Sequence, residues 1–167
     1  MKKILSTVLA ATLASLTGCA SYQPIPQNYS GPIATVTDSG SLEDGTKAQI
    51  FALTEIDGHS IRDSFMTTRQ ASYGMGAAIR LEITERQIPA RAMKVKLRGS
   101  HATGAPIHEI ASRTMGTFFD VDGVVEFTPQ ADKRYRVTGT LSKTDSVVWI
   151  EDEATHQPVT EKVTSRK

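Results

Sequence analysis

Residues 93–98 read Met-Lys-Val-Lys-Leu-Arg, with apolar and charged side chains in strict alternation. Residues 79–85 repeat the pattern as Ile-Arg-Leu-Glu-Ile-Thr-Glu. Successive side chains of a β-strand point to opposite faces of a sheet, so this alternation predicts strands with one buried face and one face in water. We therefore expect a fold built from antiparallel strands.

Strand character extends well beyond these two stretches. The alternation recurs over residues 119–127 and 134–141. Residues 33–37 are short and β-branched, and residues 48–56 and 147–150 are apolar on both faces, as interior strands are. No window of ten residues has convincing helical periodicity. The pattern predicts an all-β protein, an antiparallel sandwich of seven or eight strands.

Local signals refine this expectation. Asp57-Gly58 is typical of a tight hairpin turn, and residues 107–111 are compatible with one helical turn. Trp149, the only tryptophan, lies inside an apolar stretch, which predicts a buried structural side chain. No internal repeat or second domain is visible, so residues 33–167 are expected to form one β-sandwich domain.

Composition narrows the class of protein. Of the 167 residues, 39% are hydrophobic and 22% are charged, which excludes collagen-like, strongly disordered and multi-span membrane proteins. The formal charge is +1. A near-neutral surface offers no argument for nucleic-acid binding.

The first residues have the pattern of an export signal. Lys2 and Lys3 precede an apolar run over residues 4–16. As a helix this run would cover about 20 Å, less than the roughly 30 Å hydrocarbon core of a bilayer. We therefore expect residues 1–18 to be a signal peptide. Its removal leaves 17 basic residues against 18 acidic ones.

The run ends in Leu16-Thr17-Gly18-Cys19, which resembles the lipobox of bacterial lipoproteins. The resemblance implies cleavage before Cys19, a diacylglycerol on its thiol and an acylated amine. Cys19 is the only cysteine, so no disulfide is expected. Ala20 and Ser21 follow it, and the absence of Asp there resembles outer-membrane lipoproteins of Gram-negative bacteria. The alternative is an ordinary secretory signal with a cysteine near its cleavage site.

Residues 19–32 connect the expected anchor to the domain. They contain Pro24, Pro26 and Pro32, which disfavour a helix and favour extended polyproline II. Such a tether would hold the domain up to about 40 Å from the bilayer.

The last third of the chain carries a second resemblance. Residues 125–139 and 148–159 are similar to sandwich domains of small Gram-negative envelope lipoproteins. In these domains a Lys-containing turn leads into a strand with Tyr, and a later strand ends in acidic residues. The resemblance implies an immunoglobulin- or transthyretin-like fold on the periplasmic side of the outer membrane. It transfers no catalytic residue.

Candidate chemistry is sparse. His59-Ser60 lies near Asp57 and Asp63, but neighbouring strand residues point to opposite faces and would not meet. The four histidines, His59, His101, His108 and His156, are far apart. Residues 120–123, Asp-Val-Asp-Gly, match only a fragment of a calcium loop, and residues 151–153, Glu-Asp-Glu, read best as a solvated acidic turn.

Two surface hypotheses remain open. Residues 74–78, Gly-Met-Gly-Ala-Ala, lack the third glycine of a dinucleotide loop, and with Tyr73 they read as a flexible loop or an adaptable contact surface. Basic side chains line two predicted strands and would form one patch if the strands were neighbours: Lys94, Lys96, Arg98, Arg134 and Arg136.

These observations predict a lipid-anchored envelope protein with a non-catalytic interaction or structural module. We expect no enzymatic activity, metal or cofactor, and we expect a protein or other envelope component as partner. A binding protein for a small glycan or cation and a subunit of a secretion machine are alternatives. A third alternative is a hydrolase whose catalytic residues are far apart in the sequence. The fold could bring together four such residues: Asp63, His101, His108 and Glu109.

Overall fold

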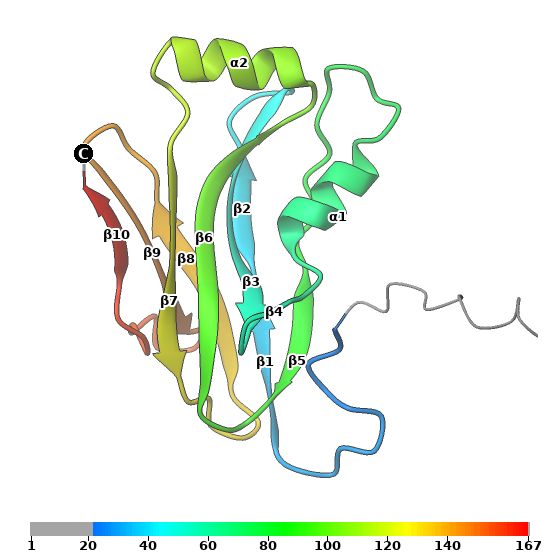
Figure 1. Ribbon diagram of the computed structural model, residues 1–167, viewed down its shortest axis with the longest axis vertical. Helices are drawn as coiled ribbons and strands as arrows, with labels where there is room; N and C mark the ends of the chain where they lie inside the picture. Colours follow the sequence, from blue (N-terminus) through cyan, green and yellow to red (C-terminus); the bar gives the residue numbers. More distant parts are fainter. Residues whose placement is uncertain (1–21, 167) are drawn as a thin grey trace, which may run out of the picture.

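The computed structural model describes residues 22–166, which fold into two facing β-sheets (Figure 1). The first sheet has five strands in the order β10-β9-β8-β1-β5. The second has the order β2-β3-β6-β7, with β4 paired to β3. The expected signal peptide and Cys19 lie outside the described residues.

The strands and helices have the following bounds. The first sheet contains β1 (Ile33–Thr37), β5 (Glu85–Pro89), β8 (Arg134–Thr140), β9 (Asp145–Asp152) and β10 (Val163–Arg166). The second contains β2 (Ser39–Leu42), β3 (Lys47–Ile56), β4 (His59–Ser60), β6 (Met93–Thr103) and β7 (Asp120–Phe127). The helices are α1 (Ser64–Ala71) and α2 (Pro106–Thr114). Neither has the length and apolarity needed to span a membrane.

The predicted all-β sandwich is confirmed, with differences in detail. Ten strands are present instead of seven or eight, because β2, β4 and β10 are too short to carry a readable alternation. The β1–β8 pair is parallel, whereas the other pairs are antiparallel. The predicted hairpin forms at Asp57-Gly58, where both residues have positive φ.

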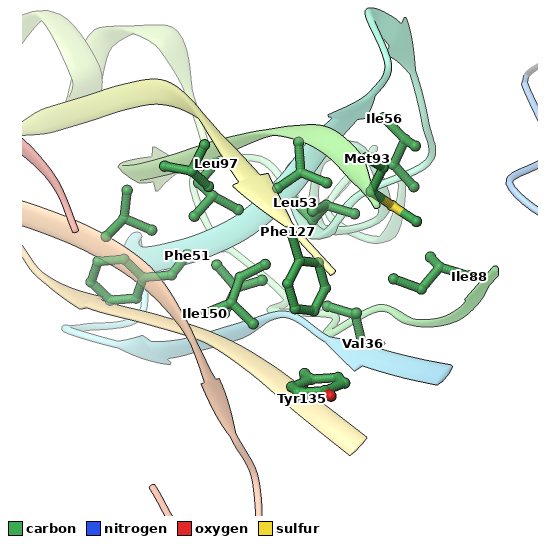
Figure 2. Packing of buried hydrophobic residues seen from close by; sticks show 14 of the residues in the cluster. Val36, Phe51, Leu53, Ile56, Ile88, Met93, Leu97, Phe127, Tyr135 and Ile150 are labelled. Carbon is green, nitrogen blue, oxygen red and sulfur yellow. The ribbon is translucent and has the colours of Figure 1, made fainter. Parts of the chain in front are cut away.

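The core lies between the two sheets (Figure 2). Phe51, Leu53 and Leu97 reach into it from the second sheet. The Phe51 ring lies between two glycines, one in each sheet. A Cβ atom would be 2.8 Å from this ring at Gly99 and 2.6 Å at Gly139. Glycine is therefore needed at both positions for the sheets to close around Phe51.

Trp149, predicted to be a buried structural side chain, is partly buried but does not join the core between the sheets. Its neighbours Val148 and Ile150 are fully buried in the core, and alternation turns Trp149 to the outer face of the first sheet. There it is half-buried, with Lys162 Nζ 4.3 Å from its ring centroid.

The predicted strand over residues 79–85 is also wrong, since β5 begins only at Glu85. Residues 79–84 are extended, but no strand pairs with them: Ile79 donates to the Gly45 carbonyl at one end, Thr84 accepts from the Asp38 amide at the other, and hydroxyls of α1 and its C-cap serve the amides between. Alternate backbone amides donate to hydroxyls four residues apart on the helix: Arg80 to Ser72 (2.9 Å), Glu82 to Thr68 (3.0 Å) and Thr84 to Ser64 (2.9 Å). Four helical residues rise about 6 Å and two extended residues about 6.6 Å, so the spacings match.

A buried polar group joins this helix to both sheets. Asp38 lies where the chain passes from β1 to β2, and its carboxylate is fully buried. It accepts hydrogen bonds from the Leu53 amide (3.0 Å) and from the amide and hydroxyl of Ser64 (3.0 and 2.9 Å). Arg86 of β5 completes the set with two bonds of 2.8 and 2.5 Å. We refer to Asp38, Ser64 and Arg86 as the Asp38 cluster.

Candidate functional site

A cavity of about 470 Å³ opens between α1, α2 and the end of β6 that leads to α2. Phe65 and Arg69 reach it from α1, Arg98 and His101 from β6, and Glu109 from α2. Figure 1 shows α2 across this end of the molecule and α1 at the side, below it. The volume lies within the range of about 300–1,000 Å³ found for small-molecule sites.

The α1 wall of the cavity comes from one helix face. Its members, Phe65, Thr68, Arg69 and Ser72, follow the i, i+3, i+4, i+7 spacing of a helix. This spacing was present in the sequence. It was missed because the face mixes aromatic, hydroxyl and charged side chains, so hydrophobic periodicity did not reveal it.

Arg98 and Arg69 are the cationic groups of the cavity. Alternation along β6 turns Arg98 away from the core, and its guanidinium carbon lies 4.8 Å from the Phe65 ring centroid. A guanidinium over an aromatic face is attracted by the ring quadrupole, which favours one orientation of the side chain. Among the described residues, neither arginine has a carboxylate within 4.0 Å.

The hydroxyl and carboxylate side chains of the wall are engaged by other groups of the protein. Ser72 and Thr68 bind the extended segment, and the Thr103 hydroxyl donates to the Ala105 carbonyl (3.2 Å). The Glu109 carboxylate is 2.9 Å from Arg113 Nη2. Among the described residues, the guanidiniums of the cavity thus have no carboxylate partner, and its one carboxylate, that of Glu109, is paired with Arg113.

His101 is the buried titratable group of the wall. Its side chain lies between Phe118 and Phe119, with centroid distances of 5.4 and 5.7 Å. Burial lowers the pKa of His101, and nearby Lys47 lowers it further, while Glu43 opposes both. His101 Nδ1 lies 3.1 Å from Glu43 Oε1, without the alignment of a hydrogen bond. Burial therefore favours the neutral imidazole.

The two sets of residues weighed for catalysis do not assemble. His59 and Ser60 are exposed in β4, and no hydrogen bond joins them. Of the dispersed set, His101 and Glu109 line the cavity, but Asp63 and His108 do not. Asp63 instead caps α1 by accepting the Met66 amide at 2.9 Å. Burial, with a smaller contribution from the Asp38 charge, raises the pKa of Asp63.

The acidic stretches are held by basic partners or backbone amides. Residues 120–123 lie in β7 and do not form a loop, and Asp122 is 3.5 Å from Lys96. Asp152 accepts the amides of Ala154 and Thr155, both at 3.0 Å. Within residues 22–166, no three His, Cys, Asp or Glu side chains converge in a way that could hold a metal ion.

The glycine loop borders the cavity. Residues 74–78 follow α1 and do not precede a helix, so they cannot place a phosphate at a helix N-terminus as a dinucleotide loop does. Tyr73 and Met75 are 91% and 45% exposed. Their exposure at the rim keeps the contact-surface hypothesis open.

The condition for a single basic patch is not met, because the two strands belong to different sheets. Lys94, Lys96 and Arg98 lie on β6 of the second sheet, and the other two residues lie on β8 of the first. Glu153 is 2.9 Å from both Arg134 and Arg136. Arg98 therefore shares a cavity with Arg69 of α1 and not a surface with the arginines of β8.

Comparisons of this chain with models of protein families, with curated proteins and with solved structures find no match in any of the three. The immunoglobulin- or transthyretin-like relationship therefore stays a prediction.

Proposed function

We propose that this protein is a lipid-anchored component of the bacterial envelope whose β-sandwich is a non-catalytic binding module. In this proposal Cys19 carries the lipid, residues 19–32 are the tether, and the domain faces the periplasm from the outer membrane. The observation that carries the binding role is the cavity between α1, α2 and β6, with two arginines that have no carboxylate within 4.0 Å among residues 22–166.

The state of the wall residues supports binding over catalysis. A nucleophilic site needs a hydroxyl or thiol in contact with a base. The wall hydroxyls of Thr68 and Ser72 hold the backbone of residues 80–82. His101 is directed between two phenylalanines and bonds to no hydroxyl.

The anchor is tested on the mature protein. Mass spectrometry of the N-terminal peptide is expected to show a chain beginning at a triacylated Cys19. Cys19→Ser is expected to leave an unlipidated precursor that does not fractionate with the outer membrane. A mature terminus at any other residue would contradict the anchor while leaving the binding module untouched.

The binding module is tested by site-specific crosslinking in intact cells. A photoreactive p-benzoylphenylalanine replaces Tyr73 at the cavity rim, and in a matched control it replaces Gln157, an exposed residue on the first-sheet side. We expect a discrete crosslinked product from position 73 and none from position 157. Equal products from both positions, or none from either, would contradict a ligand site at the cavity.

A second candidate, an assembly role such as that of a secretion-machine subunit, is favoured by α2. This helix has no buried residue, and Ile107, Ile110 and Met115 are 64%, 60% and 76% exposed. Exposed apolar side chains in a group often mark protein contacts. Ile107→Ser with Ile110→Ser would abolish co-purification of an envelope protein under this second function, but would leave the position-73 product unchanged.

A further inference from the structure

The ligand class follows from the hydrogen-bonding groups that the cavity leaves free. Thr68, Ser72 and Thr103 are engaged by the backbone, and Glu109 is engaged by Arg113. Each guanidinium carries five N–H donors and no acceptor. A ligand of the two guanidiniums must therefore supply acceptors, and His101, whose ring nitrogens have no hydrogen-bond partner among the described residues, is the other free polar side chain of the wall.

The charges in the cavity further narrow the class of ligand. Arg69 and Arg98 bring two positive charges to one hollow, and the one carboxylate in the wall, that of Glu109, is 2.9 Å from Arg113. A carboxylate ligand offers two oxygens, enough for one bidentate guanidinium. A phosphate monoester offers three terminal oxygens and nearly two negative charges, which suits two guanidiniums.

Aromatic side chains define the rest of the ligand. Phe65 lies under Arg98, and Tyr73 and Phe118 complete an aromatic part of the wall. Tyr73 is 91% exposed and has no protein partner for its ring among the described residues. Aromatic rings at a cavity rim stack on rings or cover acyl chains.

We propose that the cavity binds a phosphate monoester with an aromatic or apolar body, its phosphate held by Arg69 and Arg98 and its body against Phe65 and Tyr73. This inference rests on the proposed binding module and names its ligand class. Two sources share the chemistry: a free small-molecule monoester and a phosphatidate headgroup with its acyl chains. Arg98 and Arg69 are needed for both.

The test uses the purified full-length chain and calorimetric titration with defined probes. Phenyl phosphate is expected to bind at one site, and uncharged benzyl alcohol is expected not to bind. Arg98→Gln and Arg69→Gln are each expected to weaken phenyl phosphate binding about tenfold, the loss expected for one charge-assisted contact. The matched control Arg134→Gln removes an arginine of the first sheet that carboxylates already pair, and should leave affinity unchanged.

Dihexanoyl phosphatidic acid distinguishes the two sources. Tighter binding than phenyl phosphate supports a lipid headgroup, and weaker binding supports a free monoester. For either source of the phosphate, the binding affinity must be lower in Arg98→Gln than in the wild-type protein. Failure of both probes to bind, or unchanged binding in both arginine variants, overturns the phosphate ligand. If the position-73 crosslink persists after that failure, only the ligand class is wrong, whereas its absence also removes the binding module.

Discussion

Arg86 and Arg98 lie in the same small domain but differ in their counter-charges. The Arg86 side chain is 9% exposed and makes two bonds to a fully buried Asp38 carboxylate. Arg98 has no carboxylate partner among the described residues and lies over a phenylalanine at the cavity. A buried ion pair whose carboxylate is fully hydrogen-bonded holds elements in register, although Arg86 Nε itself has no partner among the described residues. A cation without a carboxylate partner in a cavity has its charge available for a ligand.

Helix α1 links the two regions. Its N-terminal residue Ser64 belongs to the Asp38 cluster, and its C-terminal half supplies Arg69 to the cavity. The same eight residues therefore serve fold and site at opposite ends. Substitutions can separate these two roles by their effect on stability, which should be largest in the Asp38 cluster and smallest at the cavity arginines.

Asp38→Ala should have the largest effect. It leaves a buried Arg86 without its counter-charge, which is expected to lower the free energy of unfolding by about 3–5 kcal/mol. Urea denaturation measures this, with Glu82→Ala as a control that breaks an exposed pair with Arg80 and should cost less than about 1 kcal/mol. If Asp38→Ala does not fold, Asp38→Leu with Arg86→Leu should recover part of the stability.

Thr68→Val tests whether α1 hydroxyls replace a strand partner. The Thr68 hydroxyl is bonded to both the amide and the carbonyl of Glu82, at 3.0 and 3.3 Å. Valine has the same shape but leaves the Glu82 amide unpaired, at an expected cost of about 1–3 kcal/mol. The Glu82 carbonyl keeps its bond from the Thr67 hydroxyl at 3.1 Å. The control Thr114→Val removes an exposed hydroxyl on α2. Equal midpoints for the two variants would show that residues 79–84 are held by other contacts.

His101→Phe tests the neutral imidazole beside the cavity. Because burial lowers the native pKa of His101, the unfolded state takes up its proton first as the pH falls. The stability contribution is therefore complete above the ordinary value of 6.5 and is lost as pH falls through the native pKa. The wild-type protein should lose stability more steeply below pH 6.5 than His101→Phe, by at most about 1.4 kcal/mol per pH unit. Parallel pH profiles would contradict this.

Asp63→Asn separates the effect of the N-cap hydrogen bond of α1 from the effect of the Asp63 charge. Asparagine keeps the N-cap bond to Met66, so stability at pH 7 should change by less than about 1 kcal/mol. The change should be stabilising, because burial and the Asp38 charge raise the native pKa of Asp63. A raised pKa favours the folded state below the ordinary value of 3.8, and this contribution is lost as pH rises through the native pKa. The advantage of Asn over Asp should thus vanish in acid, as denaturation at pH 3 and pH 7 would show.

Arg98→Gln should have the smallest effect on stability and completes the comparison with Arg86. Its guanidinium is exposed and makes no ion pair among the described residues, so thermal denaturation should show a change within about 0.5 kcal/mol. A loss comparable to that of Asp38→Ala would mean that Arg98 is a structural residue.

Alternation predicted the long strands well because it is a local property of the chain. Residues 93–98 and 134–141 lie in or next to β6 and β8, with Val95 and Val137 buried as expected. The same signal over residues 79–85 was misread. Period-two patterning reports an extended backbone with two distinct faces, but not which partner satisfies its hydrogen bonds.

The candidate site was predictable only in fragments. Tyr73 and the glycine loop were recognised as a surface feature, but Arg69 was not, because its helix face is polar and lacks hydrophobic periodicity. Arg98 was recognised but grouped with the wrong arginines, since alternation identifies a face and not the neighbouring strand.

The sequence by itself determined the sandwich class, the hairpin at Asp57-Gly58 and the resemblance of residues 16–19 to a lipobox, since each depends on residues close together in the chain. Only the tertiary structure decided that Asp38 meets Arg86, 48 residues away, and that Arg69 of a helix shares a cavity with Arg98 of a strand. These pairings depend on how the sheets and α1 pack, because burial and charge complementarity act through space between residues distant in sequence.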